Sequence, residues 1–230
     1  MQINGAIFDL DGTILDSMPV WTNIAGRYLA AHGIEPQENL DDKFNSLSPA
    51  EAAAWLREAY GLEEDVGVVI RGLNEIVRAP YYETVQPKPG APAFLRELRA
   101  QGARMCIATA TDRHLVEAAL RRLDLLDCFD GIFTCSEAGA GKTQPVIFQK
   151  ALAFLRTQPR RTVVFEDAVH AIRTAKSIGL PVAAVYDEKE RAHQGEIRAL
   201  ADWYAPDLGS LRGVFSGRGP SVSAESISLS

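Results

Sequence analysis

The sequence alternates between short apolar segments of strand length and longer segments in which apolar residues recur at helical spacing. The first apolar segment, residues 3–10, ends at an Asp-Leu-Asp-Gly turn. Similar segments follow at residues 103–108, 131–135, 162–165 and 181–186. Strands that alternate with helices are typical of a parallel sheet covered by helices. We therefore predict an α/β fold.

The segments between these strands carry signals for the beginning and end of helices. Pro145 suits a first helical turn, and apolar residues recur at helical spacing after it. A further helix is predicted at residues 168–178, because Gly179 and Pro181 are typical stop signals. These helices would cover the predicted sheet.

Residues 16–87 contain no strand pattern and are predicted to be helical. Apolar residues recur at helical spacing in two stripes, made of Trp21, Ile24, Ala25, Tyr28 and Leu29, and of Ala52, Trp55, Leu56, Ala59 and Tyr60. We predict a helical cap at 16–87, inserted into a core made of residues 1–15 and 88–212. Residues 213–230 are rich in Gly and Ser and lack apolar periodicity, so we predict a disordered tail there.

Composition limits the class of protein and its partners. With 47% hydrophobic and 23% charged residues in 230, most of the chain can bury a core. The 24 basic and 30 acidic residues give a formal net charge of −6, which disfavours nucleic-acid binding.

No segment approaches the roughly 20 apolar residues that cross a bilayer, and no signal peptide is visible. The three cysteines form no C-x-x-C pair, which argues against disulfides or a zinc site. We expect a cytoplasmic monomer or weak dimer with no membrane or nucleic-acid partner.

Two carboxylates follow the first predicted strand. Asp9 and Asp11 are two residues apart, so in extended chain both side chains point to the same side. Ligands of open α/β sheets bind beyond the carboxyl ends of the strands, where both residues would project. A simple turn at Asp11 and Gly12 is the alternative interpretation. A calcium loop of the EF-hand type does not fit, because Ile14 stands where that loop requires glycine.

Other predicted strands also end in polar residues. Thr109 follows the second strand, Glu166 and Asp167 follow the fourth, and Lys142 precedes a predicted helix. These groups would meet at one edge of the sheet. Carboxylates on separate strands suit a hard cation such as Mg²⁺, with Asp9 and Asp167 as the expected ligands. A carboxylate can also act as a nucleophile and form an aspartyl-phosphate.

Charge repulsion explains why each of these residue types would be needed for phosphate chemistry. At 4 Å and an effective dielectric constant near 20, each pair of like unit charges costs about 4 kcal/mol. A divalent cation together with Lys142 would offset this repulsion. Thr109 and backbone amides could then hold the oxygens of the transferring group.

Four motifs in this order resemble those of the haloacid dehalogenase superfamily, in its phosphatase and β-phosphoglucomutase-like branch. The first is Asp-Leu-Asp-Gly-Thr-Ile-Leu-Asp-Ser at residues 9–17, and the second is Thr109 after a strand. The third is Gly-Lys-Thr-Gln-Pro-Val-Ile-Phe at residues 141–148, and the fourth is Val-Phe-Glu-Asp-Ala at residues 164–168. The resemblance extends over residues 3–211.

The resemblance implies a Rossmann-like core, an inserted helical cap, and Mg²⁺-dependent hydrolysis of a small phosphorylated metabolite. Asp9 would be the nucleophile, and Asp11 the general acid and then the general base. Thr109 and Lys142 would complete the catalytic set. We expect the substrate to contact Thr109, Ala110, Lys142 and Trp21.

The resemblance also implies a ligand set for the metal. Asp9, the main-chain carbonyl of Asp11, and Asp167 would hold Mg²⁺, with Glu166 acting nearby through water.

Two alternatives to a phosphatase remain at this stage. β-Phosphoglucomutases carry a Gly, an Arg and a His in the cap region at positions aligned with Ser46, Pro49 and Trp21, so this chain departs from the mutase pattern. A non-catalytic signalling module resembling a receiver domain is the second alternative. A receiver would not be expected to carry a helical insertion after its acidic strand.

Several further residues have both a structural and a functional interpretation. Basic residues of the cap could bind the polar end of a substrate or lie on solvated helix faces; they are Lys43, Arg57, Arg71 and Arg78. His114 could line the mouth of the site or be an exposed residue of a first helical turn. Trp21 and Met18 could wall the site or pack in the cap, and we interpret the cysteines as small core residues.

Overall fold

The computed structural model describes residues 2–37, 40, 47 and 49–215. Its centre is a six-stranded sheet in which all neighbouring strands are parallel. The spatial order is β3 (Gly131–Thr134), β2 (Arg104–Thr109), β1 (Gly5–Phe8), β4 (Thr162–Glu166), β5 (Val182–Val185) and β6 (Trp203–Ala205). The predicted α/β fold with a Rossmann-like parallel sheet is confirmed.

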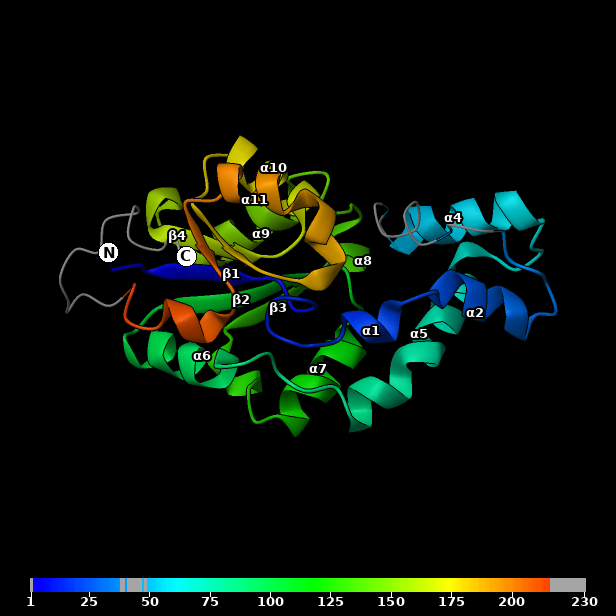
Figure 1. The fold of residues 1–230 in the computed structure, drawn as a ribbon, viewed down its shortest axis with the longest axis horizontal. Coiled ribbons are helices and arrows are strands. Elements are labelled where there is room, and N and C mark those ends of the chain that lie inside the picture. Colours follow the sequence, from blue (N-terminus) through cyan, green and yellow to red (C-terminus); the bar gives the residue numbers. More distant parts are fainter. Residues whose placement is uncertain (1, 38–39, 41–46, 48, 216–230) are drawn as a thin grey trace.

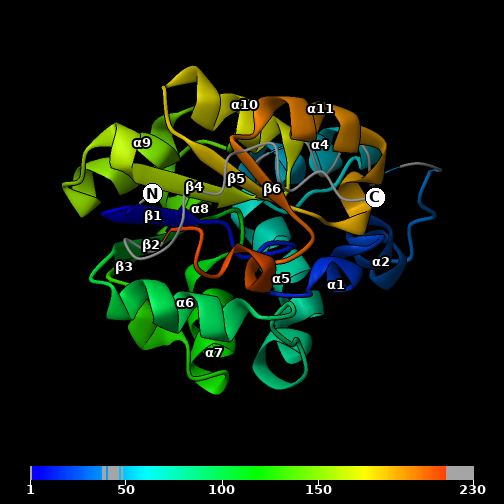
Figure 2. The same cartoon turned by 60° about the vertical axis from the view of Figure 1, so that its left-hand side comes forward.

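Helices cover both faces of the sheet, which explains why the strands read as continuous apolar segments. On one face lie α6 (Ala91–Ala100) and α7 (Arg113–Arg122), and on the other lie α9 (Val146–Leu155), α10 (Val169–Ser177) and α11 (Gln194–Leu200) (Figure 2). The side chains of β1 alternate between the two cores, with Phe8 on the α6 side and Ile7 on the α9 side.

The register of the three central strands aligns their carboxyl ends. Phe8, the last residue of β1, lies opposite Ile107 of β2 and Phe165 of β4. The polar residues that follow these strands therefore emerge at the same level of one sheet edge.

A group of helices lies beyond this edge (Figure 1). It consists of α1 (Met18–Trp21), α2 (Ile24–Ala31), α4 (Pro49–Tyr60) and α5 (Val66–Glu83). The described part of residues 16–87 contains no strand of the sheet. We call these helices the cap.

The chain enters and leaves the cap through two adjacent segments. Leu15 forms an isolated bridge with Pro87. The amide of Asp16 donates to the carbonyl of Gln86 at 2.9 Å, and the amide of Lys88 donates to the carbonyl of Ile14 at 2.8 Å. The cap is thus joined to the rest of the protein by two neighbouring chain segments that hydrogen-bond to each other.

Two local features differ from the sequence prediction. The first apolar stripe of the cap is not one helix, because Asn23 has φ 52° and separates α1 from α2. Asn adopts this left-handed conformation more readily than most residues. The edge strand β6 was not predicted, because three residues give no readable alternation.

The predicted disordered tail begins too early. Phe215 is 1% exposed, and its ring centroid lies 5.1 Å from that of Trp203 and 5.5 Å from that of Phe165. The prediction is therefore wrong for residues 213–215, where a buried aromatic ring outweighs the Gly-rich and Ser-rich composition. The remainder of the predicted tail, 216–230, lies outside the described residues.

Short helices complete the described chain: α8 (Cys135–Ala138), η1 (Leu126–Cys128), η2 (Pro159–Arg161), η3 (Glu188–His193) and η4 (Leu208–Leu211). The three cysteines are free and buried, and their burial agrees with their interpretation as small core residues. Within the described ranges, none of the helices combines the length and the apolar character needed to cross a membrane.

Candidate active site

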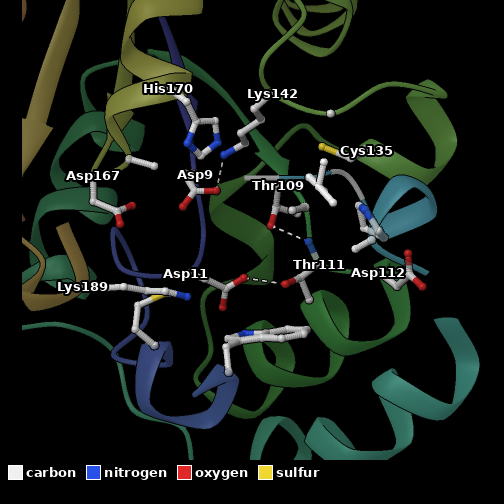
Figure 3. A pocket seen from close by; sticks show the side chains of 18 of the residues that line it. Asp9, Asp11, Thr109, Thr111, Asp112, Cys135, Lys142, Asp167, His170 and Lys189 are labelled. Carbon is white, nitrogen blue, oxygen red and sulfur yellow. Dashed lines mark hydrogen bonds and ion pairs between the residues drawn. The ribbon is translucent and has the colours of Figure 1, made fainter. Parts of the chain in front are cut away.

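The polar residues at the strand ends line one pocket between the sheet edge and the cap. Asp9 and Asp11 follow β1, Thr109 ends β2, Glu166 ends β4, and all four line this pocket. Lys142, Asp167 and Ala110 line it as well. In Figure 3 the side chains of Asp9, Asp11 and Thr109 face a common space. The sequence-predicted residues are therefore adjacent in the structure.

The turn after β1 requires glycine at position 12. Gly12 has φ +83°, and a Cβ atom there would lie 2.4 Å from Oδ2 of Asp167. The hydroxyl of Thr13 donates to Oδ1 of Asp167 at 2.8 Å. The turn is thereby held against the end of β4, which brings the two acidic motifs together.

Asp9, Glu166 and Asp167 form a buried acidic cluster. Oxygen atoms of the three carboxylates lie within 4.8 Å of one another, and the residues are 7%, 1% and 4% exposed. Burial raises the pKa of Asp9 to about 7, although Lys142 opposes this shift. Burial, followed by the charges of Glu166 and Asp9, holds the pKa of Asp167 well above its usual value.

Lys142 is the cation of this cluster. Its Nζ donates to Oδ1 of Asp9 and to Oε1 of Glu166 at 2.6 Å. Burial alone would lower the pKa of Lys142, but the carboxylates of Asp9 and Glu166 outweigh burial and raise it. Lys142 pairs with two of the three carboxylates. The single ammonium group therefore leaves negative charge that a further cation could balance.

Both carboxylate oxygens of Glu166 already accept hydrogen bonds, so this residue contributes negative charge and not free metal ligands. Its Oε2 accepts from the amides of Asp167 at 2.8 Å and Ala168 at 2.9 Å, while Oε1 accepts from Lys142. Asp9 and Asp167 have more carboxylate oxygen atoms available to bind a metal. An all-oxygen donor set with surplus negative charge suits a hard divalent cation, so the cluster could bind a metal.

Asp11 accepts three side-chain hydrogen bonds from different parts of the chain. Ser17 donates to its Oδ1 at 2.5 Å, Thr111 donates to its Oδ2 at 2.6 Å, and Tyr81 donates to Oδ1. Tyr81 accepts in turn from Nε1 of Trp21 at 2.7 Å. Burial, followed by the charge of Asp11, holds the pKa of Tyr81 well above 10, so its hydroxyl stays a donor.

Tyr81 and Thr111 were not among the sequence-predicted residues. Tyr81 lies in the cap helix α5, and the sequence signals only its place on an apolar stripe. Thr111 follows Thr109 by two residues, and its amide donates to Oγ1 of Thr109 at 3.0 Å. Because Thr109 accepts this bond, its own hydroxyl proton can donate to a ligand in the pocket that it lines.

The structure distinguishes between the structural and functional interpretations of several residues. His114 is exposed and does not line the pocket, whereas His170, in the first turn of α10, does. Burial lowers the pKa of His170. Arg57, Arg71 and Arg78 of the cap are absent from the pocket lining. Lys43 lies outside the described residues.

Trp21 combines the two roles considered for it. It lines the pocket, and it also packs against the apolar core. Pro49 lines the pocket too. Trp21 and Pro49 are two of the three positions aligned above with the mutase cap residues, and Ser46, the third, lies outside the described residues.

A family model for haloacid dehalogenase-like hydrolases matches residues 3–179. The chain belongs to this family. The phosphorylated carbohydrates phosphatase of Thermotoga maritima is 26% identical to it over 178 residues, which cover 77% of this chain and 82% of the relative. The fructose-1-phosphate phosphatase YqaB of Escherichia coli is 28% identical over 187 residues, which cover 79% and 95%.

Solved structures of the haloacid dehalogenase-like family share the fold. CbbY from Rhodobacter sphaeroides, solved in complex with phosphate, superposes with a TM-score of 0.79 at 23% identity, covering 92% of this chain and 97% of that chain. The described chain also carries the helical insertion after β1 that a receiver-like module would lack. The predicted family resemblance is confirmed.

Proposed function

We propose that this protein is a Mg²⁺-dependent phosphomonoester hydrolase that acts on a small phosphorylated metabolite through a phosphoaspartyl intermediate at Asp9. The observation that carries the proposal is the meeting of Asp9, Asp11, Thr109, Lys142 and Asp167 around one pocket. The names of the relatives, which are phosphatases of phosphorylated carbohydrates and of fructose 1-phosphate, support the reaction class.

Asp9 would perform the first chemical step. One of its carboxylate oxygens attacks phosphorus, and the bond between phosphorus and the alcohol oxygen breaks. Asp11 donates a proton to the departing oxygen, so the alcohol leaves neutral. The products of this step are the free alcohol and an acyl phosphate on Asp9.

Asp11 would then act as the general base in the second step. It accepts a proton from a water molecule as that water attacks phosphorus, and the bond between phosphorus and Asp9 breaks. Inorganic phosphate leaves, Asp9 returns to the carboxylate, and Asp11 is again protonated. Thr109, the backbone amide of Ala110 and Lys142 would hold the phosphoryl oxygens.

The acidic cluster fits Mg²⁺, because its free donors are oxygens and one ammonium leaves negative charge unbalanced. Asp9, Asp167 and the carbonyl of Asp11 would hold the ion, with Glu166 nearby. The ion would supply positive charge against the phosphate dianion and the carboxylates.

The decisive experiment compares Asp9→Asn with the wild type on p-nitrophenyl phosphate in the presence of Mg²⁺. We expect kcat to fall at least about 10³-fold, because the amide is a poor nucleophile. Asp127→Asn, an exposed position outside the pocket, is the matched control and should keep wild-type activity. Near wild-type turnover by Asp9→Asn would refute the mechanism.

A further inference from the structure

The pocket has two chemically different sides. The side made by the sheet edge and the segments beyond it is charged and contains Asp9, Asp11, Lys142, Asp167, Lys189 and Glu190. The described part of the side made by the cap is mainly apolar: Met18, Trp21, Leu47, Pro49, Ala52, Ile70 and Leu73 line it, and Asn74 is its polar member. Within the described residues, the cap contributes no charged side chain to the lining. A bound phosphomonoester would place its phosphate on the charged side and its alcohol part against the cap.

The N–H donors of Asn74 and Trp21 on the cap side already have partners within the protein. Nδ2 of Asn74 donates to Oδ2 of Asp112 at 2.5 Å, and the hydroxyl of Ser136 donates to Oδ1 of Asp112 at 2.7 Å. Nε1 of Trp21 donates to Tyr81, so Trp21 offers the pocket its aromatic ring. The described part of the cap side therefore presents mainly apolar surface to a ligand.

An alcohol part with many hydroxyl groups fits such a surface poorly. Each hydroxyl that leaves water without finding a partner disfavours binding, whereas CH and CH₂ groups gain from burial. The pocket is also small, with a volume of about 190 Å³. Both observations select for a compact substrate with few polar groups next to the cap.

On the basis of the proposed phosphatase activity, we infer that the physiological substrate is a phosphomonoester of a compact, largely apolar alcohol. Short alkyl, alicyclic and aromatic alcohols belong to this class, and polyols and sugars do not. The specificity-determining residues are Ile70 and Leu73 of α5 together with Trp21.

Two matched substrate pairs test this inference in the presence of Mg²⁺. Cyclohexylmethyl phosphate and glucose 6-phosphate both carry a six-membered ring on a primary phosphate ester. Propyl phosphate and glycerol 3-phosphate form a smaller pair. Because both members of each pair release a primary alcohol, their kcat/KM ratio reports contacts to the alcohol part. We expect the apolar member to have the higher kcat/KM by at least about 10-fold in each pair.

Variants of α5 locate the origin of the preference. Ile70→Thr, at a half-buried pocket position, replaces the ethyl branch of the side chain with a hydroxyl group, and Leu73→Asn replaces the isobutyl group with an amide. Each should reduce the apolar-to-polyol ratio of kcat/KM several-fold. Val68→Thr is the matched control, because Val68 lies on the same helix, is 37% exposed and does not line the pocket. It should leave the ratio unchanged.

The outcomes separate this inference from the proposed function. Equal or better hydrolysis of the polyol phosphates would overturn the inference and leave the phosphatase activity intact. Hydrolysis of p-nitrophenyl phosphate but of none of the four test esters would also overturn the inference and leave the phosphatase activity intact. Absence of Mg²⁺-dependent hydrolysis of all five esters would overturn both. An apolar preference that Ile70→Thr reduces and Val68→Thr preserves would support the inference.

Discussion

Tyr81 in the cap donates a hydrogen bond to the carboxylate of Asp11 in the core. The two residues are 70 positions apart in the sequence. Trp21, which also lines the pocket, donates to the hydroxyl of Tyr81 at 2.7 Å. The proposed general acid is therefore positioned partly by the cap, so movement of the cap would also move a partner of Asp11.

We predict that Tyr81→Phe lowers kcat about 10-fold, because Asp11 loses one of the donors that orient it, while the general acid itself remains. The free energy of unfolding should also fall by about 1–3 kcal/mol, since the part-buried Nε1 of Trp21 loses its acceptor. Steady-state kinetics and urea unfolding measure the two effects. Tyr82→Phe is the control, because Tyr82 is the next residue and is 40% exposed. Unchanged kcat in Tyr81→Phe would show that the contact does not position Asp11.

The raised pKa of Asp9 predicts a pH-dependent effect of Mg²⁺ on stability. Between about pH 4 and pH 7 the folded protein retains the proton of Asp9, whereas the unfolded chain has lost it. Without a divalent cation, this group therefore lowers the free energy of unfolding as the pH rises through that window, by up to about 1.4 kcal/mol per pH unit. Mg²⁺ replaces the proton, so it should raise the melting temperature more at about pH 8 than at about pH 5.

Thermal unfolding with and without saturating MgCl₂ at both pH values measures this difference. Asp9→Asn serves as the control, because it removes one of the two carboxyl groups with a raised pKa and should weaken the pH dependence of the Mg²⁺ effect. Equal stabilisation by Mg²⁺ at the two pH values in the wild type would contradict the prediction.

Lys88 should be essential for stability. Its Nζ donates to the carbonyl of Gly12 at 2.5 Å, to the carbonyl of Tyr186 at 2.8 Å and to Oδ2 of Asp187 at 2.7 Å. The side chains of Lys88 and Asp187 are 10% and 7% exposed. Lys88→Met would leave Asp187 buried without its cation, so we expect the free energy of unfolding to fall by about 3–5 kcal/mol.

Lys176→Met provides the comparison for Lys88. Lys176 pairs with Asp202 at 2.7 Å, but these side chains are 32% and 37% exposed. Loss of this solvated pair should cost at most about 1 kcal/mol in urea unfolding. Similar losses in the two variants would show that the buried pair has no special role.

The residues of the candidate site were predictable to the extent that they follow strands. Asp9, Thr109 and Glu166 could be placed together because parallel strands share one carboxyl edge, whatever the details of packing. Tyr81 and Lys88 could not, because their contacts depend on how the cap and its junction pack against residues far away in the sequence. The pattern therefore indicated the residues that we propose to react and missed the residues that contact and orient them.

Phe215, at the end of the core, also shows that local composition does not reveal packing against distant residues. Composition favoured disorder from residue 213, yet the ring of Phe215 is buried among Trp203, Phe165 and Phe94. Phe215→Ala should lower the free energy of unfolding by about 3–5 kcal/mol, because it opens a cavity among aromatic rings. Phe154→Ala removes a ring that is 39% exposed and should cost clearly less in the same urea titration. A smaller loss for Phe215→Ala than for Phe154→Ala would mean that residues 213–215 add little to the stability of the core.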